Sequence, residues 1–157
     1  MSGREESIGR WISTLYRIGQ VYIANELEQF KTGKGQHAFL AALFHQDGIS
    51  QGELAQILNM DKGAVAHAIK KLEQAGYVER KRDKDDRRVN LVYLTEKARN
   101  IEPTLSFVLS SWTDLLANGL TEEERRQILA LLKRMSEKAA YGLEQKRQLP
   151  KLQQNSV

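Results

Sequence analysis

Hydrophobic residues recur along most of the chain at steps of three and four, which is the spacing of amphipathic α-helices. The first such stretch runs from Ile8 to about Phe30, where a segment containing two glycines interrupts it. A second helix is predicted around residues 39–44, and two further apolar stripes lie over residues 101–115 and 128–143. The pattern therefore predicts a mainly α-helical chain with helices at both ends.

The middle of the chain carries start and stop signals for two short helices separated by three residues. Ser50 and Glu53 have the spacing of a capping box, in which each side chain accepts a hydrogen bond from the other residue's amide. Asp61 is placed to cap the second helix, and Gly76 supplies the left-handed residue that ends it. The signals predict a helix-turn-helix whose second helix spans about residues 61–75.

A β-hairpin is predicted directly after these two helices. Residues 77–82 and 89–94 are rich in β-branched and aromatic side chains, and the polar segment 83–88 separates them. A helix-turn-helix followed by a charged hairpin, here about residues 77–94, is the pattern of a winged helix-turn-helix. We therefore predict a mainly α fold with a small β-hairpin wing.

The charge distribution suggests a polyanionic partner for the middle of the chain. The net charge of +4 comes from 24 Lys and Arg against 20 Asp and Glu. Residues 62–88 alone hold nine basic against five acidic residues, whereas residues 1–49 are balanced. Such an excess favours a polyanion, although a solvated charged face gives the same pattern.

Residue types that are missing exclude several classes of function. The chain has no cysteine, so disulfides, thiolate catalysis and Cys-containing metal sites are excluded. His37 and His45 are eight residues apart, which is not the spacing at which two helical histidines share a metal. No catalytic arrangement and no phosphate-binding glycine loop is recognisable. We expect no enzyme activity, metal or cofactor. Without a membrane span or secretion signal, the expected location is the cytoplasm.

The solvent-facing side of the predicted second helix has the chemistry of a DNA-reading surface. The small residues Gly63 and Ala66 would let the helix approach the floor of a major groove closely. His67 can bond a base edge, while Lys70 and Lys71 suit phosphate oxygens. This helix is therefore predicted to be the recognition helix.

The hairpin tip is predicted to reach the minor groove, where an arginine is attracted by the negative potential. Asp86 is expected to orient Arg88 through a carboxylate–guanidinium hydrogen bond. The full predicted DNA-binding set is Ser50, Gln51, Lys62, Gly63, Ala66, His67, Lys70, Lys71, Asp86, Arg87 and Arg88.

Two motifs in this region resemble those of the MarR family of bacterial and archaeal transcription regulators. One is the run Leu72-Glu73-x-x-Gly76-x-x-x-Arg80, and the other is Asp86-x-Arg88 followed by Leu94-Thr95. With the order of helices, the resemblance covers about residues 8–145. It implies a homodimer that presents two recognition helices and two wings to a pseudo-palindromic double-stranded DNA operator. We expect the regulator to be a repressor.

The resemblance also implies a domain organisation. Residues 1–34 are expected to form an N-terminal dimerisation helix and linker, 35–95 the winged module, 96–146 the C-terminal dimerisation helices, and 147–157 a frayed polar tail. The apolar residues of the stripe over 101–115 form a heptad-like seam, which consists of Ile101, Leu105, Val108, Trp112 and Leu115. This seam and the stripe over 128–143 are expected in the dimer interface, because so small a winged module cannot bury them alone.

Many regulators of this family are released from DNA by small phenolic or aromatic acids, and five residues here have suitable types. They are Trp11, Tyr16, Arg17, His37 and Phe39. The plainer interpretation, which we favour, is that Trp11 and Phe39 belong to the core and Arg17 is a solvated charge. For the whole protein, the alternative function is a winged protein-interaction module for an acidic partner. Salt dependence distinguishes the two functions. The logarithm of the DNA-binding constant falls against the logarithm of the salt concentration with a slope of about −0.9 per phosphate contact.

Overall fold

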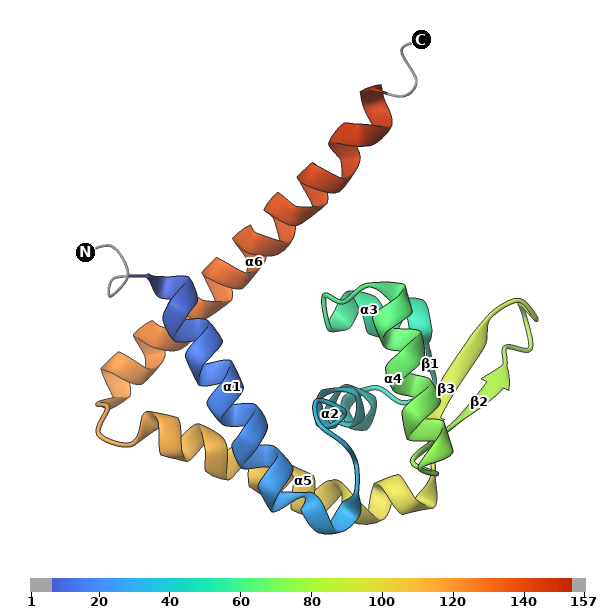
Figure 1. The fold of residues 1–157 in the computed structure, drawn as a ribbon, viewed down its shortest axis with the longest axis horizontal. Helices are drawn as coiled ribbons and strands as arrows, with labels where there is room; N and C mark the ends of the chain where they lie inside the picture. Colours follow the sequence, from blue (N-terminus) through green and yellow to red (C-terminus); the bar gives the residue numbers. More distant parts are fainter. Residues whose placement is uncertain (1–6, 154–157) are drawn as a thin grey trace. The chain divides into compact units, whose positions relative to one another are not determined.

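The computed structural model describes residues 7–153 and the side chains of residues 7–146. Two compact units are present, one up to Leu115 and one from Leu116 onward (Figure 1). The elements in chain order are α1 (Ile8–Glu26), the 3-10 helix η2 (Glu28–Phe30), α2 (His37–His45), β1 (Ile49–Ser50), α3 (Gln51–Ile57), α4 (Lys62–Gln74), β2 (Val78–Arg82), β3 (Asn90–Leu94), α5 (Glu96–Ala117) and α6 (Glu122–Gln153). The predicted mainly α fold with a small β wing is confirmed.

The helix boundaries in the middle of the chain follow the capping signals of the sequence. The Ser50 hydroxyl accepts from the Glu53 amide at 3.1 Å, and the Glu53 carboxylate accepts from the Ser50 amide at 2.8 Å. The Asp61 carboxylate accepts from the Ala64 amide at 2.9 Å and starts α4. Gly76, with φ of +78°, follows the end of that helix. The predicted helix-turn-helix is thus confirmed in its local detail.

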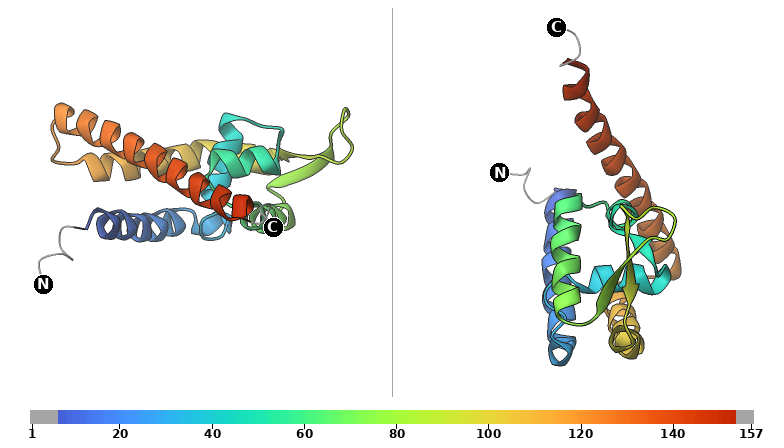
Figure 2. Two further views of the ribbon diagram at one scale, coloured as in Figure 1. Left: turned by 90° about the horizontal axis from the view of Figure 1, so that it is seen from above. Right: turned by 90° about the vertical axis from the view of Figure 1, so that its right-hand side faces the viewer.

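The sheet contains one strand more than the sequence predicts. Strands β2 and β3 form the predicted antiparallel hairpin, with Val78 opposite Leu94 and Arg82 opposite Asn90. The short strand β1 adds to the other side of β3 and pairs Ile49 with Val92, so the strand order is β1-β3-β2. The sequence does not predict β1, because a strand of two residues is too short to show an alternating pattern. The hairpin projects beyond the helices of the module (Figure 2).

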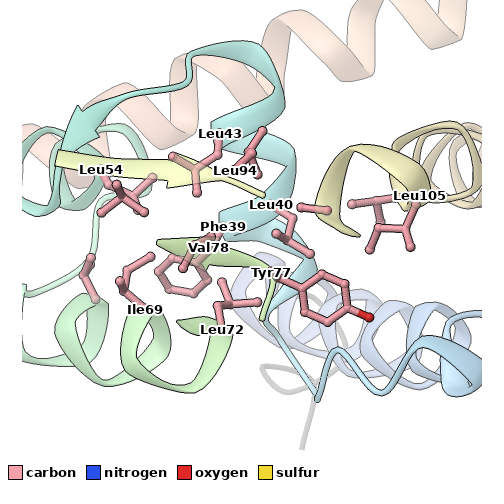
Figure 3. Close-up of a cluster of buried hydrophobic side chains, with 14 of the residues drawn as sticks. Phe39, Leu40, Leu43, Leu54, Ile69, Leu72, Tyr77, Val78, Leu94 and Leu105 are labelled. Carbon is pink, nitrogen blue, oxygen red and sulfur yellow. The ribbon is translucent and has the colours of Figure 1, made fainter. Parts of the chain in front are cut away.

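A hydrophobic core lies between the end of α1, α2, α3, α4, the sheet and the first half of α5 (Figure 3). The side chains with no accessible surface are Leu40, Leu43, Leu54, Val65, Ile69, Leu72, Val92 and Ala98. The same core takes up Ile101, Leu105 and Val108, which corrects the prediction that the whole seam of α5 lies in a dimer interface. The reason is that the first turns of α5 pack against the winged module of their own chain.

Asp47 joins three segments of the first unit. One carboxylate oxygen accepts from the Leu94 amide at 2.9 Å and from the Gly48 amide at 3.0 Å, while the other accepts from the Arg99 guanidinium at 2.5 Å. Gly48 has φ of +71°, and a Cβ there would lie 2.7 Å from the Tyr93 ring. The loop before β1 is therefore tied to both β3 and α5.

The second unit consists mainly of α6, which begins with the predicted capping box of Thr121 and Glu124. The helix continues to Gln153, whereas the sequence indicates a frayed tail from residue 147; residues 154–157 lie outside the described part. Across residues 7–153, none of the helices combines the length and apolar character needed to cross a bilayer.

Candidate nucleic-acid interface

The recognition helix α4 separates two kinds of side chain by helical spacing. Val65, Ile69 and Leu72 are fully buried in the core. The opposite side exposes Lys62, Gly63, His67, Lys70 and Lys71, and Ala66 is half-buried beside them. Because the buried side anchors α4 to the module, the helix presents the remaining residues outward as one rigid surface. All the residues predicted for major-groove reading on α4 lie on this surface.

Ser50 and Gln51 lie at the start of α3, and both are half-buried. The Ser50 hydroxyl is engaged in the capping box, and the hydrogen bond that the Ser50 amide donates to the Glu53 carboxylate lowers the pKa of Glu53. The side-chain nitrogen of Gln51 is buried, and within the described chain it has no hydrogen-bond partner. The DNA contacts predicted for these two residues stay a prediction.

The tip of the wing is a loop closed by backbone hydrogen bonds. The Asp83 amide donates to the Val89 carbonyl oxygen, and the Val89 amide donates to the Asp86 carbonyl oxygen, both at 2.9 Å. One Asp86 carboxylate oxygen accepts from the Arg88 amide at 3.0 Å and from Arg88 Nε at 3.3 Å. The Arg88 side chain is still 94% exposed. Asp86 thus binds the Nε of Arg88, as the sequence predicts, while the rest of the Arg88 guanidinium is exposed to solvent.

Carboxylates on the module are largely engaged within the protein. Glu73 at the end of α4 binds Arg80 on β2 through two hydrogen bonds of 3.2 and 2.5 Å, and this pairing lowers the pKa of Glu73. Glu79 pairs with Lys81 at 2.6 Å. Within the described residues, no ion pair involves the exposed cations Lys62, Lys70, Lys71, Arg82, Lys84 and Arg87. These six cations lie along α4 and the wing.

Arg82 and Lys84 were not among the residues predicted for DNA binding. Both are exposed on the wing, one at the end of β2 and the other in the tip loop. The signal that could have found them is the basic run over 80–88, whose members share the same hairpin. Glu73 and Arg80 both belong to the motif that resembles the MarR family, but their direct contact could not be predicted from it, because the contact depends on how β2 returns beside α4.

The five residues predicted for an effector site are not gathered in one cavity of this chain. Phe39 is buried in the core, in agreement with the plainer interpretation, whereas Trp11 and Tyr16 are 55% and 65% exposed on α1. His37 is nearly buried, and desolvation lowers its pKa. Arg17 is exposed, hydrogen-bonds to Thr14 and lines a shallow hollow on α1. The effector site stays a prediction. The described residues contain no cluster of three or more His, Cys, Asp or Glu that could hold a metal.

Comparison with known proteins agrees with this geometry. Residues 34–89, which contain α2 to α4 and the wing as far as its tip, match the model of the MarR family. The HTH-type transcriptional regulator YybA of Bacillus subtilis is 31% identical over 110 residues, covering 70% of this chain and 73% of YybA.

Two solved structures are similar over nearly their full length. A MarR transcriptional regulator from Methanosarcina mazei Go1 has a TM-score of 0.78 and 43% identity, covering 84% of this chain and 95% of that one. A MarR family regulator from Listeria monocytogenes, solved in complex with a 26mer DNA, has a TM-score of 0.84 and 27% identity, covering 90% and 95%. These relatives are transcription regulators, not enzymes.

Proposed function

Because this chain belongs to the MarR family of DNA-binding transcriptional regulators, we propose that it acts as a homodimeric repressor. Two recognition helices and two wings bind a pseudo-palindromic operator, and a small aromatic acid releases the protein from it. The observation that carries the proposal is the group of exposed cations on α4 and the wing that no ion pair within the described residues involves. If the two-fold axis places the recognition helices one turn of DNA apart, the half-sites are centred about ten base pairs apart.

The homodimer is supported by apolar side chains that the single chain leaves exposed. On α1 these include Ile8, Ile12, Leu15 and Ile18, and on α6 they include Ile128, Leu129, Leu132 and Leu143. Exposed apolar surface of this extent is typical of an interface. A second copy is the occupant that the resemblance implies for both helices.

Operator preference is expected to differ from that of other family members. Ala64, Ala66 and His67 occupy positions where the family often carries Ser, Thr or Arg, so fewer hydrogen-bonding groups face the bases. Ala66 is placed to contact a thymine methyl group. The operator therefore has to be determined for this protein itself.

The test is a gel-shift titration with the promoter DNA upstream of the protein's own gene, at two salt concentrations and with excess nonspecific competitor. A competitor-resistant complex that weakens with salt at a slope of about −0.9 per phosphate contact is expected. If that promoter gives no such complex, sites selected from a random duplex library replace it. Absence of any sequence-specific, salt-dependent complex would contradict the proposal and favour a protein partner instead.

The wing contact is tested with Arg88→Ala. Because the guanidinium is exposed and oriented by Asp86, its removal is expected to weaken operator binding by roughly 1–3 kcal/mol while leaving thermal stability unchanged. The matched control is Arg126→Ala, which removes the same charge from α6, where Arg126 pairs with Glu123 at 2.6 Å. Wild-type affinity in the Arg88 variant would show that the wing does not read DNA through this residue.

A further inference from the structure

The C-terminal end of the recognition helix is held by the segment that starts α5. Lys97 Nζ donates to the Ala75 carbonyl oxygen at 2.7 Å, and Thr95 Oγ1 donates to the Gly76 carbonyl oxygen at 2.7 Å. The Thr95 amide donates to the Tyr77 carbonyl oxygen at 3.0 Å. The last carbonyls of a helix have no partner within the helix. Here Lys97 binds the carbonyl oxygen of Ala75, the C-cap of α4, and Thr95 binds those of Gly76 and Tyr77, which follow the helix.

Tyr77 extends the same junction to the N-terminal part of the chain. Its ring is buried, Lys97 Nζ lies 4.4 Å from the ring centroid, and its hydroxyl donates to the Phe30 carbonyl oxygen in η2. Figure 3 shows this hydroxyl directed away from the aliphatic side chains of the core. The exit of α4, the start of α5 and the end of η2 therefore meet around one lysine and one tyrosine.

From this junction, α5 leads toward the surface assigned to the partner subunit. Its residues Ile101, Leu105 and Val108 are buried against the module, and further along Leu115 is 57% exposed. These buried residues attach the first half of α5 to the core of the module. A shift between α4 and α5 at the junction would therefore change the direction in which α4 and the wing meet a DNA duplex bound by two subunits.

We propose that Lys97 is a positioning residue for operator recognition, which fixes the exit of the recognition helix on the first turn of α5 without touching DNA. This inference rests on the proposed function. Lys97 is exposed like the lysines of α4, but its ammonium binds a backbone carbonyl oxygen and lies over an aromatic ring of its own chain. The hydrogen bond and the ring contact together tie the start of α5 to the exit of α4.

The experiment compares three variants by fluorescence anisotropy with the selected operator duplex and with a random-sequence duplex, over a series of salt concentrations. Lys97→Met keeps the length of the side chain and its packing on Tyr77 but removes the donor. Lys97→Arg retains a donor and a cation. Lys34→Met, at an exposed lysine in the loop before α2, controls for the loss of one positive charge.

Lys97→Met is expected to bind the operator about tenfold more weakly than wild type, which corresponds to about 1.4 kcal/mol. Its affinity for the random duplex should match that of the Lys34 variant, and its salt slope should stay that of wild type. Lys97→Arg should recover most of the operator affinity. A salt slope reduced by about 0.9, with equal losses on both duplexes, would mean that Lys97 binds a phosphate and would overturn the proposal.

Amide hydrogen exchange of the free protein separates this inference from the proposed function. In Lys97→Met, faster exchange is expected at residues 75–78 and at the start of α5, with unchanged exchange in α3. Unchanged exchange at residues 75–78 would overturn the inference even if the operator is bound. If wild type shows no specific DNA complex, the proposed function fails, and the exchange result still reports whether Lys97 holds the exit of α4.

Discussion

The winged module and the terminal helices differ in how far their apolar residues are buried. In the module, Leu40, Leu54 and Leu72 have no accessible surface. On α1 and α6, by contrast, Leu15 is 45% exposed and Leu129 is 58% exposed. The module closes its own core within one chain, whereas the apolar stripes of α1 and α6 stay exposed and form the interface of the proposed homodimer. Under that proposal, folding and assembly are carried by separate parts of this protein.

The largest change in the free energy of unfolding is expected from a substitution that leaves a cavity in the core of the module. Leu72 lies on the buried side of α4, and Leu72→Ala should lower the free energy of unfolding by about 2–5 kcal/mol through lost burial and an unfilled space. Urea denaturation followed by circular dichroism measures the change. Leu72→Met, which nearly conserves volume, should cost less than about 1.5 kcal/mol. Equal stability of the Ala variant and wild type would mean that the module does not depend on this core.

A charge on α1 should act on assembly rather than on the module. Leu15→Asp would require a carboxylate to be buried in the interface, so dimerisation should weaken at least tenfold, or about 1.4 kcal/mol. Sedimentation at micromolar concentration should then show the 17.9 kDa single chain rather than a dimer. Asn25→Asp adds the same charge at an exposed position of α1 and should leave the dimer intact. A monomeric wild type would contradict the interface altogether.

The smallest effect concerns His37, at the start of α2. Burial lowers its pKa below the ordinary value of 6.5, so the unfolded chain binds a proton more readily than the folded one. The contribution of neutral His37 to the free energy of unfolding should therefore be fully present above pH 6.5. Below that pH the free energy of unfolding should fall, by at most about 1.4 kcal/mol per pH unit.

His37→Gln should remove that dependence, as measured by denaturation between pH 7.5 and 5.5. His45→Gln, at the exposed end of the same helix, is the matched control and should follow the wild-type profile. If the His37 variant and wild type lose stability in parallel over this range, the burial of His37 does not govern the response of the module to acid.

Local signals account for the parts of the fold that the sequence predicted. Ser50 with Glu53, Asp61 and Gly76 act on residues within four positions of themselves, so their effects are visible in the sequence. Contacts between distant segments left no such signal. Asp47 binds Arg99 across 52 positions, and the strand at Ile49 is recognised only by its pairing with Val92.

The candidate site also contains features that short-range signals predict and features that depend on distant segments. The outward residues of α4 and the Asp86–Arg88 pair follow from helical spacing and from neighbours two positions apart, so the sequence predicts them. The seam of α5 is different, because periodicity shows that Ile101 and Leu105 share a face but not what covers it. The junction of Lys97 with Ala75 and Tyr77 also depends on where the hairpin returns the chain.

By itself, the sequence determined the order of the helices, their caps, the hairpin and the basic surface, because each depends on short-range spacing. Only the tertiary structure decided which apolar faces the chain buries for itself and which it leaves exposed. It also decided that the exit of the recognition helix rests on the first turn of α5. The physical reason is that burial and long-range hydrogen bonds depend on the packing of distant segments, which periodicity along one chain does not encode.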